Sequence, residues 1–267
     1  MKLVLRLTSS IFRRWDFWLA VGLYAYFLCM PLYSEYQRGG GMPALYFLNR
    51  TYRATDARSI LQVIALFPVI RTFFYQLDSS YLSLWLVRKS SWRSLAILVA
   101  ESLLMTGAVV GLGYVLSLAF IACFAPVAST DGRILSQLVT QYPGAHLLGS
   151  PWVGFYYLIP YFLQWATTSC TLLVVMGLAM FTDNILFLTI SPLLFYALFR
   201  MKLVWYMVNP LNIFTPEITA LKGMYNNQLL PVLAHQLAYL ILYILLAYYL
   251  LHRALKKRII GRYQFAI

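Results

Sequence analysis

Charged residues are scarce in this sequence, and their scarcity excludes most classes of soluble protein. They make up 11% of the 267 residues, and hydrophobic residues make up 61%, whereas a typical globular domain has about 25% charged residues. The mean hydropathy is correspondingly high, at +0.71. Because so few charges cannot cover a particle of this size, lipid must solvate much of its surface. We therefore expect an all-α, polytopic membrane protein with a single transmembrane domain over residues 1–267.

Residues that form disulfides, metal sites or nucleotide sites are also few or absent. The three cysteines fall in separate apolar runs without a CxxC pair, which indicates buried thiols rather than a disulfide framework or a zinc site. The three histidines lie in different segments with no acid at metal-ligand spacing. The sequence also lacks a GxxxxGK[ST] phosphate loop. We expect no metal, cofactor or nucleotide site in this chain, and no enzymatic activity of its own.

Six apolar stretches are candidates for membrane-spanning helices, because about 20 residues are needed to cross the hydrocarbon core. The third and fourth are long enough to tilt or to project beyond the membrane, and the second and fifth are short and contain a proline. The predicted spans are Trp15–Ser34, Ser59–Tyr75, Leu95–Phe124, Pro151–Phe181, Asn184–Phe199 and Leu229–Leu251. Residues 182–184 are expected to form a tight turn between the fourth and fifth spans.

The distribution of basic residues predicts the orientation of these spans. With the N-terminus inside the cell, 13 of the 21 Lys and Arg residues fall on the cytoplasmic side, which is the side where flanking positive charge accumulates. A dense basic cluster, from Arg253 to Arg262, follows the last span. We therefore expect both termini to be cytoplasmic, and we assign the net charge of +13 to these flanks rather than to nucleic-acid binding.

Two further segments are predicted to lie at the membrane surfaces. Residues 1–14 place apolar side chains near one helical face and most basic side chains off it, which suits an interfacial helix, with a plain basic flank as the alternative. Residues 200–228 form an external segment that is unusually apolar for a loop. This segment either dips back into the outer leaflet or is an ordinary loop with aromatic anchors.

The connection at residues 76–93 carries the clearest pattern outside the spans. One stripe of a helix is formed by residues at i, i+4, i+7, i+8 and i+11, namely Leu77, Tyr81, Leu84, Trp85 and Arg88. An acid lies near the start of the segment and basic residues lie near its end, as the helix dipole favours. A cytoplasmic amphipathic helix of this kind can dock into a groove on a soluble partner or lie on lipid, and periodicity does not separate the two.

The layout as a whole resembles the membrane-spanning permease subunits of ABC exporters, of the ABC-2-type class. The shared features are an N-terminal amphipathic helix, six spans, an amphipathic helix between spans two and three, a near-zero loop between spans four and five, and an external Asn209-Pro210 before the last span. The most local match is FFYQLD at 73–78 followed by RKSSWR at 88–93. In such permeases an acid and a glycine open the coupling helix. Here Asp78 stands for the acid, and two serines replace the glycine.

The resemblance implies that residues 76–88 form a coupling helix that binds an ABC ATP-binding subunit through Gln76, Asp78, Tyr81, Trp85 and Arg88. That partner would bind ATP and Mg, and a second permease subunit, identical or different, would complete the pathway. The implied function is ATP-driven export of an amphipathic, lipidic or peptide substrate across a bacterial plasma membrane. The rival functions are an ion-coupled carrier or channel subunit and, further off, a membrane-embedded enzyme.

The third span contains one ionisable residue and a pair of glycines. Glu101 lies about two turns into this span, where a charge is costly. It is expected either to form a structural pair with Arg71 or Arg93, or to act in substrate binding or gating. Gly107 and Gly111 form a GxxxG pattern, which lets helices approach closely, and are expected to pack against another span of this chain or of a partner.

Overall fold

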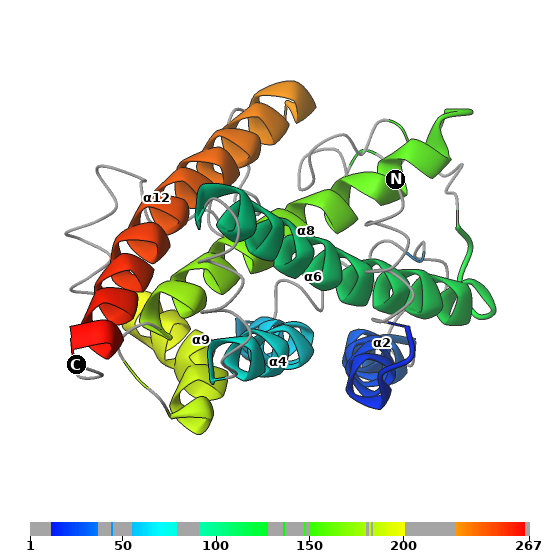
Figure 1. The fold of residues 1–267 in the computed structure, drawn as a ribbon. Coiled ribbons are helices and arrows are strands. Elements are labelled where there is room, and N and C mark those ends of the chain that lie inside the picture. Colours follow the sequence, from blue (N-terminus) through cyan, green and yellow to red (C-terminus); the bar gives the residue numbers. More distant parts are fainter. Residues whose placement is uncertain are drawn as a thin grey trace.

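The computed structural model describes residues 12–36, 55–78, 91–127, 150–179, 184–200 and 228–264, together with residues 44, 136, 147 and 182. The regular elements in this part of the chain are all α-helices (Figure 1). They are α2 (Trp15–Tyr36), α4 (Thr55–Asp78), α6 (Ser91–Ala122), α8 (Val153–Leu178), α9 (Ile185–Arg200) and α12 (Leu229–Gln264). Each overlaps one of the six predicted stretches, so the all-α prediction is confirmed for the described residues.

Three of the helices are long and apolar enough to cross a membrane. Their apolar parts are Leu95–Ala122 in α6, Val153–Leu178 in α8 and Leu229–Arg253 in α12. Within the described residues, the apolar parts of the other three are shorter, at Trp15–Met30 in α2, Ile60–Phe73 in α4 and Ile185–Leu194 in α9. The three long helices are consistent with an integral membrane protein. Of the six predicted spans, the structure supports the three in α6, α8 and α12.

Contacts among α2, α4 and α6 give the relative directions of these helices. The start of α2 lies beside the end of α4, where Arg14 donates a hydrogen bond to the Thr72 hydroxyl. The same end of α2 lies within electrostatic range of α6, since the charge of Arg14 acts on Glu101. Further along both helices, the Ser117 hydroxyl donates to the Ala25 carbonyl over 3.3 Å. Thus α6 runs in the direction of α2, and α4 runs against it.

Helix α8 runs against α6 and lies in the middle of the molecule. Near its start, the Tyr157 hydroxyl donates to the Val127 carbonyl, just past the end of α6, over 2.5 Å. Further along, the Trp165 indole N–H donates to the Leu103 carbonyl over 3.1 Å. Helix α8 also packs against α4, α9 and α12. Both α8 and α12 end toward the lower left of Figure 1.

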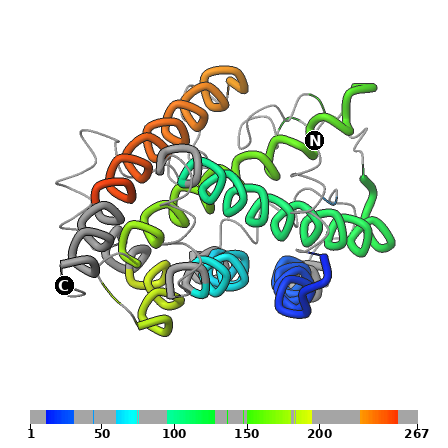
Figure 2. Tube along the Cα trace, viewed as in Figure 1, coloured from blue at the N-terminus to red at the C-terminus, as the bar shows by residue number. Residues whose placement is uncertain are grey.

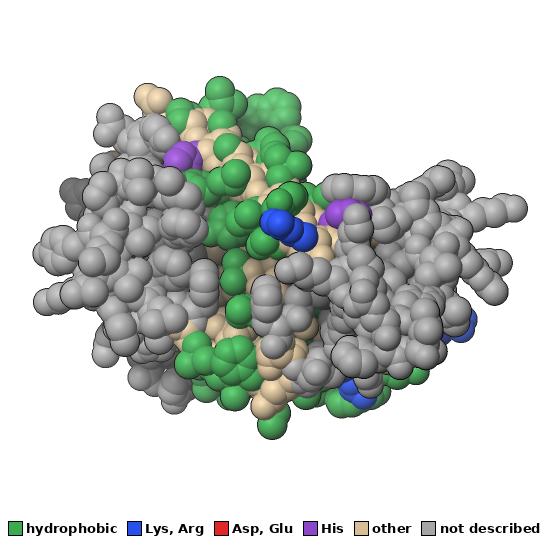
Figure 3. Space-filling view, turned by 60° about the vertical axis from the view of Figure 1, so that its left-hand side comes forward, with side chains coloured by type: hydrophobic (Ala, Val, Ile, Leu, Met, Phe, Trp, Pro, Cys, Tyr) green, Lys and Arg blue, Asp and Glu red, His purple; other side chains and the backbone are tan. Residues whose placement is uncertain are grey.

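The packing places apolar side chains on the outside as well as the inside. In the apolar 18-residue stretch of α8, 67% of the residues are buried, whereas only 28% are buried in the corresponding stretch of α12. The outer side of α12 exposes large hydrophobic side chains, among them Leu237, Ile241, Leu245 and Tyr249. Figure 3 shows a band of hydrophobic side chains on the described part of one face. An apolar surface of this extent is typical of helices that contact lipid.

The three segments predicted to lie beside the spans fall largely outside the described residues. Figure 2 traces the helices along their Cα atoms in the view of Figure 1. Residues 12 and 13 form a turn and residue 14 is irregular, so this part ahead of α2 is not helical, and residues 1–11 lie outside the description. Because α4 continues to Asp78 and α6 begins at Ser91, the segment predicted at 76–93 is helical at both ends, and residues 79–90 lie outside. Residues 201–227 lie outside as well.

Candidate functional site

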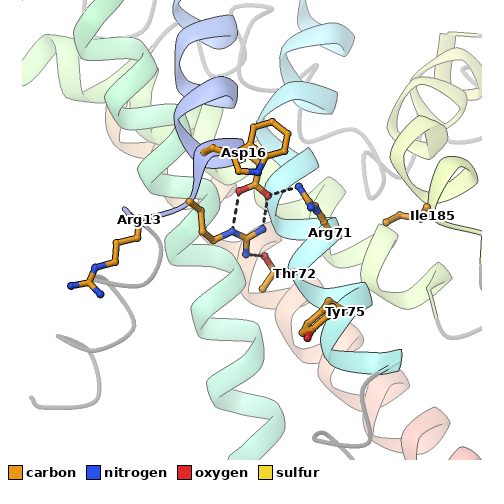
Figure 4. Close-up of a pocket in the computed structure, with 8 residues that line it drawn as sticks. Arg13, Asp16, Arg71, Thr72, Tyr75 and Ile185 are labelled. Atoms are coloured by element: carbon orange, nitrogen blue, oxygen red, sulfur yellow. Dashed lines mark hydrogen bonds and ion pairs between the residues drawn. The ribbon is translucent and has the colours of Figure 1, made fainter.

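Asp16, in the first turn of α2, is held between two arginines (Figure 4). Its side chain is only 2% exposed. Arg14 contacts both carboxylate oxygens, with its Nη2 2.5 Å from Oδ2 and its Nε 3.0 Å from Oδ1. Arg71, near the end of α4, places its Nη1 3.6 Å from the same Oδ2. The two guanidinium groups therefore neutralise a carboxylate that apolar surroundings would otherwise strongly disfavour.

The local sequence explains why the carboxylate is placed there. An acid in the first turn of a helix interacts favourably with the helix dipole, and the Phe17 N–H donates to Asp16 Oδ1 over 3.1 Å. The neighbouring Arg14 also donates to the Thr72 hydroxyl, which in turn donates to the Pro68 carbonyl over 2.7 Å. This chain of hydrogen bonds and ion pairs joins the start of α2 to the end of α4.

A cavity of about 610 Å³ lies beside this charged cluster. It is formed where the start of α2, the end of α4 and the start of α9 meet. The residues that line it are Arg13, Arg14, Trp15, Asp16, Arg71, Thr72, Tyr75 and Ile185. In Figure 4 the Arg13 side chain points away from Asp16, while Thr72 and Arg71 turn toward it. The cavity thus combines three cations and one carboxylate with aromatic and aliphatic walls.

Glu101 does not pair with Arg71 in the structure. The salt bridge of Arg71 is to Asp16, and the cation whose charge acts on the half-buried Glu101 is Arg14. Of the two expected partners, the pairing with Arg71 is therefore corrected, and the side chain of Arg93 lies outside the described residues. The physical reason is that the antiparallel packing of α2 and α4 brings Arg71 to the acid at the start of α2.

Gly107 and Gly111 face aromatic side chains of α8 in the same chain. A Cβ at Gly107 would lie 3.0 Å from the Trp165 Nε1, and one at Gly111 would lie 3.1 Å from the ring of Tyr161. An even closer approach occurs at Gly113, where a Cβ would lie 2.7 Å from the Tyr24 ring of α2. The small residues of α6 therefore lie where two neighbouring helices come close to its backbone.

The predicted partner-binding residues can be placed only by their position along the chain. Gln76 and Asp78 belong to the last turn of α4, with side chains outside the description, and Tyr81, Trp85 and Arg88 lie in the segment that is not described. The helical part of this segment begins at Gln76, directly after Tyr75, which lines the cavity. The charged cluster and the predicted coupling segment are thus neighbours on α4.

Two features of the site were not predicted from the sequence. The first is the pairing of Asp16 with Arg71, for which the available signal was an acid in the first turn of one span and an arginine in the last turns of the next. The second feature is a buried polar run in α8, comprising Gln164, Thr167, Thr168, Ser169 and Thr171. The presence of polar residues inside an apolar stretch is the sequence signal from which this run could have been predicted.

The buried polar run is mostly satisfied by its own helix. The hydroxyls of Thr167 and Thr171 donate to the carbonyls of Leu163 and Thr167 over 2.8 and 3.3 Å, and Gln164 Nε2 donates to the Thr168 hydroxyl over 3.5 Å. The hydroxyl of Ser169 has no hydrogen-bond partner among the described residues. In the same part of the chain, no group of three or more His, Cys, Asp or Glu residues is placed to hold a metal ion.

Comparison of the chain with protein-family models, with curated proteins and with solved structures found no significant match.

Proposed function

We propose that this chain is the transmembrane permease subunit of an ATP-driven ABC exporter, with six spans and both termini in the cytoplasm. A separate ATP-binding subunit would bind ATP and Mg, and a second permease subunit would complete the pathway. The substrate class that suits the apolar, aromatic-rich helices is amphipathic, lipidic or peptidic. The main support from the sequence is the layout, including the amphipathic pattern at residues 76–88.

The observation that carries the proposal is the attachment of α2 to the end of α4. The Arg14–Asp16–Arg71 cluster and the Arg14–Thr72 hydrogen bond join these helices within two turns of the predicted coupling segment. A force that a partner exerts on residues 79–90 would therefore move α2 as well as α4. Such a rigid connection is what a permease needs if ATP-driven movement of a soluble subunit is to move several helices together.

The alternating directions of α2, α4, α6 and α8 give further support. They bring the start of α2, the end of α4, the end of α8 and the start of α9 to one end of the molecule. With the N-terminus inside, this is the cytoplasmic end, where a cytosolic ATPase would bind. A carrier or channel subunit would share this topology, but it would have no use for a partner-binding face at residues 76–88.

The proposal is tested by purifying the tagged full-length chain from its native membranes in a mild detergent. We expect a protein with a Walker-type ATPase sequence to co-purify in near-stoichiometric amount, together with ATP hydrolysis. Trp85→Ala or Asp78→Lys should remove both, because each alters the predicted binding face, while the variant chain still inserts in the membrane. The measurements are quantitative mass spectrometry and phosphate release.

The matched control is Trp152→Ala, which removes an exposed tryptophan ahead of α8, at the opposite end of the molecule. The Trp152→Ala chain should co-purify with as much ATPase as the wild-type chain does. Recovery of no ATPase with the wild-type chain would contradict the proposal, as would equal loss from the Trp85 and Trp152 variants.

A further inference from the structure

The cavity beside Asp16 has a positive charge that its own residues do not neutralise. It is lined by three arginines and one carboxylate. Arg14 donates a hydrogen bond to each carboxylate oxygen of Asp16. Three positive charges and one negative charge leave the cavity lining with a net charge of +2, and Arg71 is the more weakly paired of the two partners of Asp16.

Arg71 is the residue best placed to bind such an anion. A guanidinium carries five N–H donors in a planar fork. The only salt bridge of Arg71 to a described residue is the 3.6 Å contact with one oxygen of Asp16, and 47% of its side chain is exposed. Its guanidinium also lies 5.4 Å from the centre of the Trp15 ring, which orients the planar group. Most of its donors are consequently available to a planar or tetrahedral oxyanion.

The walls of the cavity place it at the level of the lipid headgroups. Trp15 is the first residue of the apolar part of α2. Arg71 lies two residues before the end of the apolar part of α4. Both Trp15 and Tyr75 are exposed, at 64% and 76%. Exposed aromatic rings at the ends of apolar helices are typical of the membrane–water interface. Basic pockets between helices at this level are suited to phosphate-bearing headgroups.

We propose that this cavity is a binding site for a phosphate group, supplied by the headgroup of an anionic phospholipid or by a soluble phosphate compound. Arg71 donates to the phosphate oxygens, Arg13 contributes long-range attraction, and Trp15 and Tyr75 border the organic part of the ligand. Asp16 does not repel the ligand because Arg14 neutralises it. Since the site joins α2, α4 and α9, a bound phosphate would hold these helices together. The inference holds whether or not the chain belongs to an exporter.

The experiment uses the purified full-length chain in a neutral detergent. Dioleoyl phosphatidylglycerol, dioleoyl phosphatidylcholine and inorganic phosphate are added separately, and binding is followed by native mass spectrometry and by the shift in melting temperature. We expect saturable, one-to-one binding of phosphatidylglycerol or of inorganic phosphate, and none of comparable affinity for phosphatidylcholine. Arg71→Gln should weaken the binding about tenfold, because the lost hydrogen bonds are to a charged group.

The control variant is Arg253→Gln, which removes an exposed arginine of α12 and changes the net charge by the same amount. It should bind the anion as the wild type does. Arg71→Lys keeps the charge but loses the planar fork, and should bind with intermediate affinity. This second variant keeps the test decisive if Arg71→Gln does not fold.

The outcomes separate the two sources of phosphate. Binding of phosphatidylglycerol that excess inorganic phosphate does not displace assigns the site to a lipid, whereas displacement by inorganic phosphate assigns it to a soluble compound. Equal weakening by Arg71→Gln and Arg253→Gln would overturn the inference, because it would reduce the effect to general charge attraction. Absence of saturable binding to either anion would overturn it as well.

Discussion

Asp16 shows how one carboxylate can join two helices in apolar surroundings. Its two oxygens accept hydrogen bonds from Nε and Nη2 of Arg14 and from the Phe17 N–H, and the Arg71 Nη1 lies 3.6 Å from Oδ2. A nearly buried acid is stable only if its charge and its hydrogen-bonding capacity are satisfied by neighbours. The cost of desolvating Asp16 is offset by partners that come from two separate segments of the chain.

Replacing Asp16 with asparagine tests this account at the residue scale. We expect Asp16→Asn to lower the free energy of unfolding by about 2–3 kcal/mol, because two arginines would face each other without the carboxylate. This value is below the loss for a fully buried pair, since both arginines are partly exposed. The measurement is thermal or denaturant unfolding in detergent.

The double variant Asp16→Asn/Arg14→Gln supplies the control for this prediction. It removes the uncompensated guanidinium and should recover part of the lost stability. A single variant as stable as the wild type would mean that the cluster contributes nothing to the packing of α2 on α4.

At the scale of the elements, the spacing between α2 and α6 is set by a glycine opposite a tyrosine. The ring of Tyr24 is fully buried and lies so close to Gly113 that a Cβ would come within 2.7 Å of it. One turn further along α6, the Ser117 hydroxyl donates to the Ala25 carbonyl of α2. A small residue and an interhelical hydrogen bond thus occur where the two backbones are closest.

Gly113→Ala should therefore lower the free energy of unfolding by about 1–3 kcal/mol, the usual cost of overpacking a core. Because the Tyr24 ring is fully buried and its own Cβ would also lie 3.1 Å from the new Cβ, either this side chain or the two helices must shift. Gly22→Ala is the matched control, because a Cβ there meets nothing within 4 Å. It should be neutral or stabilising, by up to roughly 1 kcal/mol from helix propensity. Equal destabilisation by both variants would contradict the proposed role of Gly113.

At the scale of the whole molecule, the directions of the helices fix which residues share an end. The beginning of α2, the end of α4 and the beginning of α9 line one cavity, and the end of α6 lies with the beginning of α8 at the other end. Native Cys123 follows α6 directly and is exposed, whereas Cys170 is buried within α8. These cysteines provide a direct test of the proposed orientation.

In a Cys29→Ser/Cys170→Ser variant, Cys123 should react with a membrane-impermeant maleimide added outside intact cells, because the end of α6 would be external. In a chain without native cysteines, Arg253→Cys should react only after the membrane is permeabilised. Mass spectrometry of the labelled chain measures both. Labelling of both positions from the same side would contradict the alternating topology.

The apolar pattern of the chain is enough to locate the helices along it. A run of apolar residues in lipid must satisfy its backbone hydrogen bonds internally, so composition alone predicts a helix in each of the six stretches. Their ends agree with the structure to within three residues, except that α4 and α6 each begin four residues earlier than predicted, at Thr55 and Ser91, and α12 continues to Gln264. Helix ends depend on local contacts that an apolar pattern does not encode.

Which side chains meet depends instead on how the helices pack. Arg71 was available to either of two acids, and the packing of the start of α2 against the end of α4 paired it with Asp16 rather than Glu101. Likewise, three glycines of α6 have similar sequence contexts, and the position of the Tyr24 ring makes Gly113 the tightest of them. Apolar patterning sets the position of each helix along the chain, whereas rotation and pairing depend on contacts between residues far apart in sequence.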